Sequence, residues 1–392
     1  MRVLSFTTLF PNSADPVHAI FVYQRLVHLA RRPGNQVQVV SPIPYVPSGL
    51  HAERYRALRG IPPQEQIGGL QVWHPRYLLV PRVSMPLHGL LMFLGSLPLV
   101  RRLHRETPFD CIDAHYVYPD GLAAILLGKF LGLPVVVSAR GSDINLFPSF
   151  RLIRPMIRWT LRKAAGIISV SQALKEAIIE LHVPAEKITV IGNGVDSKRF
   201  QPVDRTAARH QLGLPEDARI LVAVGALRPV KGYQFLLPAI AEILPRYPKL
   251  QLYILGEGDY RPKLEAMIEK LNLQGRVVLV GGKPNDELKN WYSAADVSCL
   301  LSSREGWANV LLESLACGTP VLATRVWGAP EVIVSPELGV LVEQDVHAIS
   351  NGLELALGKS WDREFLLRHA RSRTWDDVAT EVERYLASCI AR

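Results

Sequence analysis

The chain has 392 residues, of which 48% are hydrophobic and 21% are charged. This length exceeds the size at which a single core stops growing, so we expect two domains, and the composition excludes a disordered protein. The formal net charge of +9 is unevenly spread, because residues 1–200 carry +11 and residues 201–392 carry −2. A basic first half favours an anionic partner such as nucleic acid, an acidic sugar polymer or a membrane surface.

The cysteines and the apolar stretches bear on where the protein works. The cysteines show no paired, metal-type spacing: Cys111, Cys299, Cys317 and Cys389. We therefore expect reduced, buried thiols in a cytoplasmic enzyme. Residues 1–10 are better interpreted as a first strand than as a signal peptide. Residues 86–100 are apolar but fall short of the ~20 residues that span a bilayer, so we expect no membrane crossing.

The first half of the sequence predicts an α/β domain. Strand-like runs occur at residues 3–6, 37–41, 111–114, 134–138, 166–170 and 188–191. Helical patterns alternate with them at residues 20–31, 119–131, 151–164 and 171–181. This alternation predicts a parallel sheet with helices on both faces. Residues 196–217 are polar and contain Pro202 and Pro215, so we expect the linker near there.

Arginines recur at helical spacing within residues 150–166. Four of them fall at intervals of three, four and four, which places them in one stripe of a helix: Arg151, Arg154, Arg158 and Arg162. Others flank the apolar residues 86–100: Arg82, Arg101, Arg102 and Arg105. Two interpretations stay open. The helix either packs on a core and leaves a solvated arginine face, or it belongs to a surface that rests on anionic lipid.

The second half of the sequence repeats the alternation. Strands are predicted near residues 220–224, 250–255, 277–280, 297–301, 321–323 and 339–342. The loop at 225–232 carries Arg228 and Lys231, and ligands of open parallel sheets bind at the carboxyl ends of strands, so we expect both cations to face phosphates. Pro229 keeps the residue before it out of the helical region and the loop extended. The second strand ends in a glycine-rich turn at 256–258 that permits close backbone approach.

Two glutamates, Glu305 and Glu313, lie eight positions apart around the start of an expected helix. If the whole span were helical, a rise of ~1.5 Å per residue would separate the carboxylates by ~12 Å. That exceeds the roughly 5 to 9.5 Å at which two carboxyls share one glycosidic bond. The pair therefore suits two ends of one long ligand, and the N–H groups at the helix start favour an anion between them. The pattern predicts a sugar nucleotide.

The remaining patterns narrow the class of protein. Residues 375–390 form an amphipathic pattern and are predicted to be a helix. Neither half has a Gly-x-Gly-x-x-Gly fingerprint after its first strand, which argues against a dinucleotide oxidoreductase. No recognised nucleic-acid-binding motif accompanies the basic half, so we expect no nucleic-acid partner.

Taken in order, these segments resemble the retaining glycosyltransferases of family 4, which have the two-domain, phosphorylase-like fold called GT-B. The likeness spans nearly the whole chain and rests on residues 110–121, 140–143, 169–173, 191–196, 225–232, 256–258, 305–313, 317–320 and 328–331. The resemblance implies two Rossmann-like, doubly wound parallel-sheet domains of α/β class that face each other across a cleft. Residues 1–198 with 374–392 would form an acceptor-side domain, and residues 199–373 would bind the nucleotide-sugar donor. The last helix would then cross back onto the first domain.

The resemblance also implies roles for individual residues. Arg228 and Lys231 would neutralise the departing diphosphate of the donor, Glu305 would lie beside the donor sugar, and Glu313 would accept hydrogen bonds from the ribose. His115 would face the donor sugar from the first domain. Further substrate contacts would come from Gly258, from the backbone N–H groups of Ala308, Asn309 and Val310, and, on the acceptor side, from Arg140 and Asp143.

The implied reaction has a nucleotide diphosphate sugar as donor and a glycan or a lipid-linked molecule as acceptor. No metal ion and no cofactor are expected, because the two cations and the helix start stabilise the leaving group electrostatically. The enzyme is expected in the cytoplasm, and under the lipid interpretation it would lie peripherally on the inner face of the cytoplasmic membrane.

Three residues depart from the family pattern, and other functions stay open. Ala19 stands in a loop where glycine is common, Trp307 replaces a smaller aromatic residue, and Trp327 lies where small residues are usual.

The alternative functions are a sugar-nucleotide epimerase, a glycan phosphorylase and a non-catalytic nucleotide-sugar-binding protein. Net transfer to an acceptor would exclude the first. Dependence on phosphate or a lysine-bound cofactor would mark the second, and the retained charged residues disfavour the third.

Overall fold

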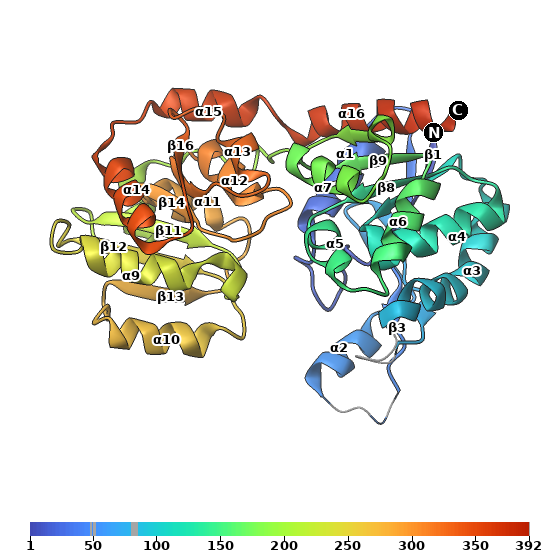
Figure 1. Ribbon diagram of the computed structural model, residues 1–392, viewed down its shortest axis with the longest axis horizontal. Coiled ribbons are helices and arrows are strands. Elements are labelled where there is room, and N and C mark those ends of the chain that lie inside the picture. The colour runs from blue at the N-terminus through green and yellow to red at the C-terminus, as the bar shows by residue number, and fades with distance from the viewer. Residues whose placement is uncertain (48, 50–51, 80–84, 392) are drawn as a thin grey trace. The chain divides into compact units, whose positions relative to one another are not determined.

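A computed structural model describes residues 1–47, 49, 52–79 and 85–391. The chain divides into two compact units, one formed by Met1–Asn193 with Trp375–Arg392 and the other by Gly194–Thr374 (Figure 1). Each unit is a Rossmann-like layer of parallel strands between helices, so the predicted α/β class is confirmed. None of the helices in the described ranges combines the length and apolarity that crossing a bilayer requires.

The sheet of the first unit has the strand order β10-β9-β8-β7-β1-β2-β5-β4. Its strands are β1 (Arg2–Phe6), β2 (Gln36–Val40), β4 (Gln64–Ile67), β5 (Leu70–Trp73), β7 (Cys111–His115), β8 (Val135–Ala139), β9 (Gly166–Ser169) and β10 (Ile188–Val190). All pairings are parallel except that of β4 with β5. A separate two-stranded ladder joins β3 (Ile43–Pro44) to β6 (Arg76–Tyr77). The six predicted strands are confirmed, whereas β3 to β6 were not predicted.

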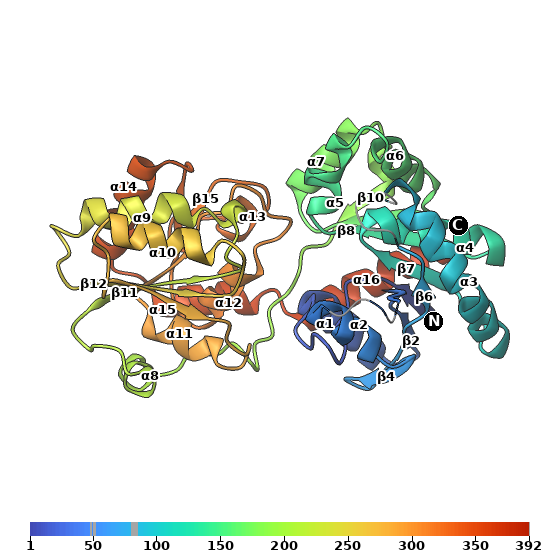
Figure 2. The ribbon, with the colours of Figure 1, turned by 90° about the horizontal axis from the view of Figure 1, so that it is seen from below.

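Helices cover both faces of this sheet. They are α1 (Ile20–Arg31), α2 (Glu53–Gly60), α3 (His88–Glu106), α4 (Leu122–Leu131), α5 (Ser142–Asn145), α6 (Arg154–Lys163), α7 (Gln172–Glu180) and α16 (Trp375–Ile390). Side chains alternate across a strand, and in β8 they separate the two layers. Val136 packs in one core with α1 and α16, while Val135 and Val137 contact glycines at the two ends of α4. Next to α4 lie α3 and α6 (Figure 2).

The second unit has one sheet with the order β13-β12-β11-β14-β15-β16, in which every strand is parallel. The strands are β11 (Arg219–Val224), β12 (Leu250–Leu255), β13 (Val277–Gly281), β14 (Val297–Leu300), β15 (Val321–Thr324) and β16 (Gly339–Val342). All six predicted strands are confirmed, because strands buried on both faces read as continuous apolar runs. The strand order reverses between β11 and β14, which brings the loops that follow these strands together.

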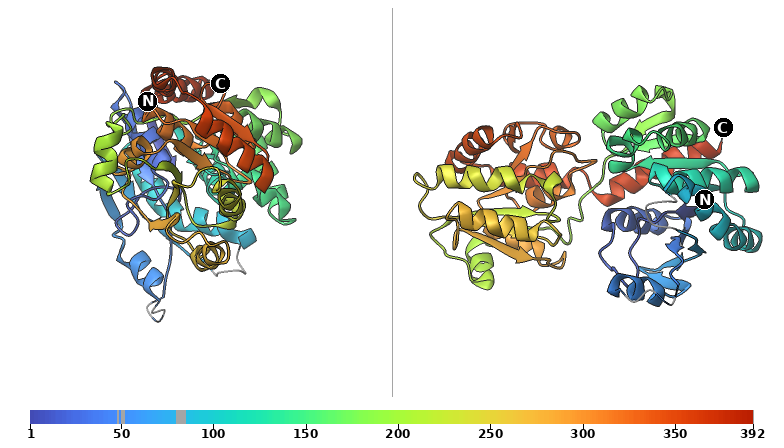
Figure 3. Two further views of the ribbon diagram at one scale, coloured as in Figure 1. Left: turned by 90° about the vertical axis from the view of Figure 1, so that its left-hand side faces the viewer. Right: turned by 60° about the horizontal axis from the view of Figure 1, so that its bottom comes forward.

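Two cores lie on opposite faces of this sheet. Figures 2 and 3 show helices on both of these faces. One is covered by α9 (Tyr233–Ile243), α10 (Arg261–Lys270) and α14 (Val346–Gly358). The other is covered by α8 (Arg205–Leu212), α11 (Leu288–Ala294), α12 (Asn309–Ala316), α13 (Ala329–Val332) and α15 (Arg363–Arg371). Residues 196–217, where we expected the linker, contain α8, which packs on α11. Buried Arg209 fixes α8 by donating to the Ala294 carbonyl at 3.0 Å and to Asp296 at 2.9 Å.

Candidate active site

The loop after β11 is built to hold two cations at the carboxyl end of the sheet. Arg228 is extended, with φ −136° and ψ 150°, as the following Pro229 predicts. Lys231 ends a short 3-10 turn, and Gly232 then adopts φ 75° before α9 begins. A Cβ atom on Gly232 would lie 1.9 Å from the Leu301 carbonyl oxygen, so only glycine lets this loop contact the end of β14.

The glycines after β12 support the same loop. A Cβ atom on Gly256 would lie 2.0 Å from the Gly225 carbonyl oxygen, and one on Gly258 would lie 2.3 Å from that of Leu227. The Leu227 N–H donates to the Glu257 carbonyl at 2.9 Å and fixes this approach. The close backbone approach predicted for these glycines is therefore made to the loop after β11. A direct substrate contact by Gly258 stays a prediction.

Lys231 and Glu305 form an ion pair that sequence reasoning did not anticipate. The Lys231 Nζ lies 2.6 Å from Glu305 Oε1, and the Ser302 hydroxyl donates to the same oxygen at 2.6 Å. Arg228, by contrast, is exposed, and within the described residues its guanidinium has no ion-pair partner. The structure thus brings Arg228, Lys231 and Glu305 together. Lys231 is paired with Glu305, and Arg228 forms no ion pair with any described residue.

The segment between the two glutamates is only partly helical. Helix α12 begins at Asn309, so Glu305 precedes the helix, and the ~12 Å separation worked for a continuous helix does not apply. The Asn309 N–H donates to the Trp307 carbonyl at 3.2 Å. The N–H groups of Ala308 and Val310 donate no hydrogen bond to any described residue. Two of the three expected donors are therefore available to a ligand.

Glu313 lies one turn inside α12 and is partly buried. The Tyr292 hydroxyl donates to Glu313 Oε2 at 3.2 Å, a partner that the sequence did not reveal. Burial raises the pKa of Glu313 to about 7, although the Tyr292 hydroxyl and the nearby Arg199 favour its ionised form. Its charge therefore changes within the physiological pH range.

In the first unit, His115 ends β7 and belongs to a buried charged cluster. Arg25 of α1 donates to both Asp113 oxygens, at 3.0 and 3.1 Å, and to the Ser138 hydroxyl at 2.8 Å. Asp113 Oδ2 lies 3.3 Å from His115 Nε2, and Arg140 Nη2 lies 2.5 Å from His115 Nδ1. Burial lowers the pKa of His115 to about 3, so the ring is neutral. Because a guanidinium only donates, Nδ1 is the acceptor and the proton sits on Nε2.

Asp143 ties together the two loops of this cluster. Its carboxylate accepts the N–H groups of Val117 at 2.9 Å, Gly141 at 2.8 Å and Arg140 at 3.1 Å, and it is fully buried. This carboxylate holds the loop after β8 against the segment that follows β7. The predicted contacts of Arg140 and Asp143 with an acceptor stay predictions.

The residues that depart from the family pattern show two kinds of effect. Ala19 and Trp327 both have φ 47°, so each position demands the left-handed region without a glycine to occupy it. Trp307 packs against the core of the second unit, and its indole N–H has no hydrogen-bond partner among the described residues.

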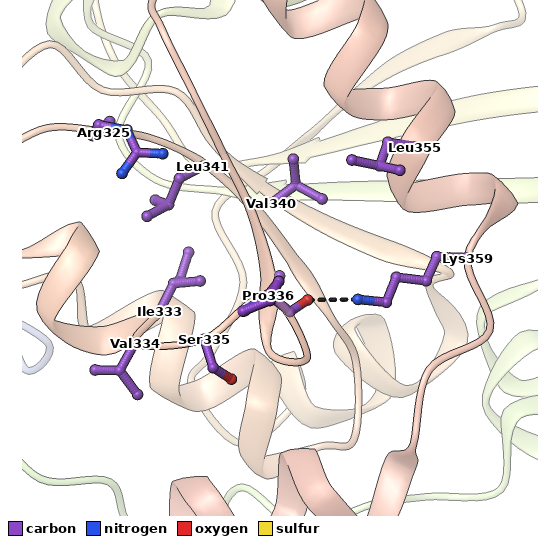
Figure 4. Close-up of a pocket in the computed structure, with 10 residues that line it drawn as sticks. Arg325, Ile333, Val334, Ser335, Pro336, Val340, Leu341, Leu355 and Lys359 are labelled. Atoms are coloured by element: carbon purple, nitrogen blue, oxygen red, sulfur yellow. Dashed lines mark hydrogen bonds between the residues drawn. The ribbon is translucent and has the colours of Figure 1, made fainter.

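A cavity of about 530 Å³ lies elsewhere in the second unit, at the outer strand β16 (Figure 4). Ile333, Val340 and Leu341 line it, and the Lys359 ammonium at its rim donates to the Pro336 carbonyl at 2.7 Å. Strands β14 and β15 separate β16 from β11. None of the predicted site residues lines this cavity.

The chain matches two known protein families along most of its length. The model of the family described as glycosyl transferases group 1 matches residues 204–373, and that of glycosyltransferase family 4 matches residues 19–199. A D-inositol 3-phosphate glycosyltransferase of Corynebacterium urealyticum is 35% identical over 320 residues, which are 76% of this chain and 75% of the relative. The chain belongs to the glycosyltransferases of family 4. Another relative of this glycosyltransferase is TuaC of Bacillus subtilis, whose name assigns it to teichuronic acid biosynthesis; it is 30% identical over 361 residues, 90% of this chain and 88% of TuaC.

Solved structures confirm the predicted fold. Sucrose-phosphate synthase from Thermosynechococcus elongatus has a TM-score of 0.81 at 22% identity and covers 100% of this chain and 99% of its own. Anabaena HepE, solved in complex with UDP-glucose, has a TM-score of 0.72 at 20% identity, with 99% of each chain covered. This glycosyltransferase therefore has the two-domain GT-B fold.

Proposed function

We propose that this glycosyltransferase moves a sugar from a nucleotide diphosphate sugar to a glycan or lipid-linked acceptor, with retention of the anomeric configuration and without a metal ion. The observation that carries the proposal is the gathering of Arg228, Lys231 and Glu305 on the loops after β11 and β14, with Glu313 on the helix that follows. Ligands of open parallel sheets bind at the point where the strand order reverses, and these two strands form that point.

Arg228 and Lys231 would stabilise the diphosphate as it leaves. The free Arg228 guanidinium offers a planar fork to a phosphate, and Lys231 offers a point charge. A diphosphate would compete with Glu305 for Lys231, and a released Glu305 carboxylate would accept hydroxyl groups of the donor sugar. Without the donor, the Lys231 ammonium and the Glu305 carboxylate, which are both partly buried, satisfy each other's charge. Preorganised charges of this kind replace a metal ion in stabilising the leaving group.

The rest of the donor would lie along α12. The N–H groups of Ala308 and Val310 suit phosphate or sugar oxygens at a helix start. Glu313 would accept hydrogen bonds from the ribose hydroxyls. The acceptor hydroxyl would attack C1 from the side of the leaving group. The bond from C1 to the phosphate oxygen breaks, the bond to the acceptor oxygen forms, and the acceptor proton passes to the departing diphosphate.

We assign the donor to residues 199–373 and the acceptor to residues 1–198 with 374–392, where His115, Arg140 and Asp143 cluster. HepE was solved with UDP and with UDP-glucose, which makes a uridine diphosphate sugar the first donor to test. The name of TuaC supports a glycan acceptor. Since nucleotide sugars are cytoplasmic metabolites, we also propose that the enzyme acts in the cytoplasm.

The test begins with thermal unfolding in the presence of UDP-glucose, GDP-mannose or ADP-glucose, one of which should raise the unfolding temperature. Calorimetry then separates the two glutamates. Glu313→Ala should weaken binding of the free nucleotide. Glu305→Ala should not weaken it, because Lys231 is then free for the diphosphate, but should slow sugar transfer. Unchanged nucleotide affinity in Glu313→Ala would refute the ribose assignment. A new sugar nucleotide formed without any acceptor would instead identify an epimerase.

A further inference from the structure

Helix α3 exposes a stripe that changes from apolar to basic along its length. Leu87, Leu90 and Leu94 are 52%, 44% and 53% exposed, and Arg101 and Arg105 continue the stripe as exposed cations. These positions fall at intervals of three, four, seven and four, so they share one face of the helix. Leucines that recur on one exposed helix face are different from single exposed leucines, which are normal on any protein. Arg82, also expected here, lies outside the described residues.

Helix α6 adds a second basic stripe. Ile153, Ile157 and Leu161 are buried, so the helix packs on the core through this face, as one of the two interpretations of the sequence requires. The opposite face presents exposed arginines: Arg154, Arg158 and Arg162, preceded by Arg151. Among the described residues none of these four forms an ion pair, so their charge is not neutralised by the protein. Nearby Leu152 is 67% exposed.

Helix α4 joins the two stripes into one surface. The Arg101 guanidinium lies 6.0 Å from the centre of the Phe130 ring, which links α3 to α4. The Lys129 ammonium lies 4.6 Å from the centre of a ring of Trp159, which links α4 to α6. The three helices are neighbours in the fold (Figures 1 and 2). We call the exposed residues named above, which lie on α3 and α6 and in the turns just before them, together with Lys129 and Phe130, the helical basic surface.

The charge of this surface is nearly all of one sign. Helices α3, α4 and α6 carry eight lysines and arginines against a single acidic residue, Glu106, which lies 3.8 Å from Arg102. Cations alone would suit any polyanion. The exposed leucines add an apolar element that a phosphate backbone does not contact, whereas the boundary between headgroups and acyl chains accepts both. A bilayer that contains anionic lipid is therefore the partner that fits both observations.

We propose that the helical basic surface docks the first unit on an anionic membrane, with the leucines of α3 entering the headgroup region and the arginines of α6 lying over lipid phosphates. The inference rests on the proposed function, because it gives a lipid-linked acceptor a place to meet the enzyme. The surface faces away from the sheet, so docking leaves the buried cluster of His115 undisturbed.

The test is cosedimentation of the full chain with vesicles of phosphatidylcholine alone or mixed with phosphatidylglycerol, at low salt. Wild-type protein should bind the mixed vesicles and not the neutral ones. Replacing Arg151, Arg154, Arg158 and Arg162 with glutamine should weaken binding roughly thirtyfold or more, since each cation near an anionic surface contributes measurably. The matched control replaces four exposed cations of the second unit with glutamine: Lys263, Lys270, Arg368 and Arg371. That control should bind as the wild type does.

The apolar element has its own test. Leu90→Ser with Leu94→Ser should weaken vesicle binding about tenfold, because the buried methyl and methylene groups are lost. Leu355→Ser, at an exposed leucine of the second unit, should change nothing. Equal binding to neutral and mixed vesicles, or full binding by the four-arginine variant, would overturn the proposal. The proposal would also be overturned if the chain bound duplex RNA but no vesicles. In that case the arginine changes would abolish RNA binding and the leucine changes would leave it intact.

Thermal stabilisation by donor separates this inference from the proposed function. If the chain binds vesicles but no sugar nucleotide raises its unfolding temperature, the membrane-docking inference is supported and the proposed function is refuted. If a donor raises the unfolding temperature but the chain binds no vesicles, the proposed function is supported and the docking inference is refuted. Each variant is also unfolded thermally, so that a loss of vesicle binding is attributed to the surface only where the unfolding temperature is unchanged.

Discussion

Glu313 should make donor binding dependent on pH near neutrality. Its pKa is raised to about 7 by burial, so it is mostly protonated at pH 6 and mostly ionised at pH 8. Ribose hydroxyls bind a carboxylate more strongly than a carboxylic acid, since hydrogen bonds to charged groups are the stronger ones. If only protein with ionised Glu313 binds the donor, the fraction of binding-competent protein rises from about one-eleventh at pH 6 to about ten-elevenths at pH 8. The affinity for the donor then rises about tenfold. The sign follows: binding strengthens as pH rises.

Calorimetry with UDP-glucose at pH 6, 7 and 8 measures this change. The ligand is a diphosphate diester, so its own charge is constant across the range. Glu313→Gln keeps the shape of the side chain and removes its titration, and the slope should vanish in that variant. A second buried carboxyl, Asp120, also has a pKa raised to about 7 but lies in the first unit, so the glutamine variant tells the two apart. An equal slope in Glu313→Gln, or a flat wild-type profile, would refute the reasoning.

Two further predictions follow from the loops. Arg228→Ala and Lys231→Ala should each lower kcat/KM at least about tenfold while the protein stays folded, since each removes a charge aimed at the leaving diphosphate. Turnover near the wild-type rate in either variant would refute the phosphate site. Ala19→Gly should stabilise the protein by about 0.5–1 kcal/mol in urea unfolding, because relief of the left-handed strain exceeds the added chain entropy. Ala177→Gly, inside α7, should instead destabilise it by about 1 kcal/mol, and equal signs for the two would contradict this account.

The sequence predicted the strands that form apolar runs and missed short strands at one edge of the first sheet. The strands of the second unit are continuous apolar runs because helices cover both faces of their sheet. Strands β4 and β5 escaped prediction because each is only four residues long, and β4 (Gln64–Ile67), which forms the outer edge of the first sheet, is mostly polar. Helix α8 was taken for linker because its polar sequence hides the buried Arg209 that fixes it.

The candidate site was predicted as residues but not as contacts. The pairing of Lys231 with Glu305 depends on how closely Gly232 approaches Leu301, a distance that no local pattern encodes. Asp113 was within reach of sequence reasoning, because alternation along a strand places it on the same side as His115. Arg25 was not, since arginines are rarely buried and nothing in its helix marks it as a partner.

The helix that completes the first unit is synthesised after the whole of the second unit. Trp375, Val382 and Leu386 of α16 complete a core that begins at Val3, and Tyr385 donates from this helix to the Lys187 carbonyl at 2.7 Å. The whole sheet of the second unit is available before α16 has been made, whereas the first unit lacks one of its helices until α16 emerges. Domains fold in order of emergence only when each is contiguous. On the ribosome, the unit that begins first should therefore be the one that folds last, and removal of α16 should unfold the first unit.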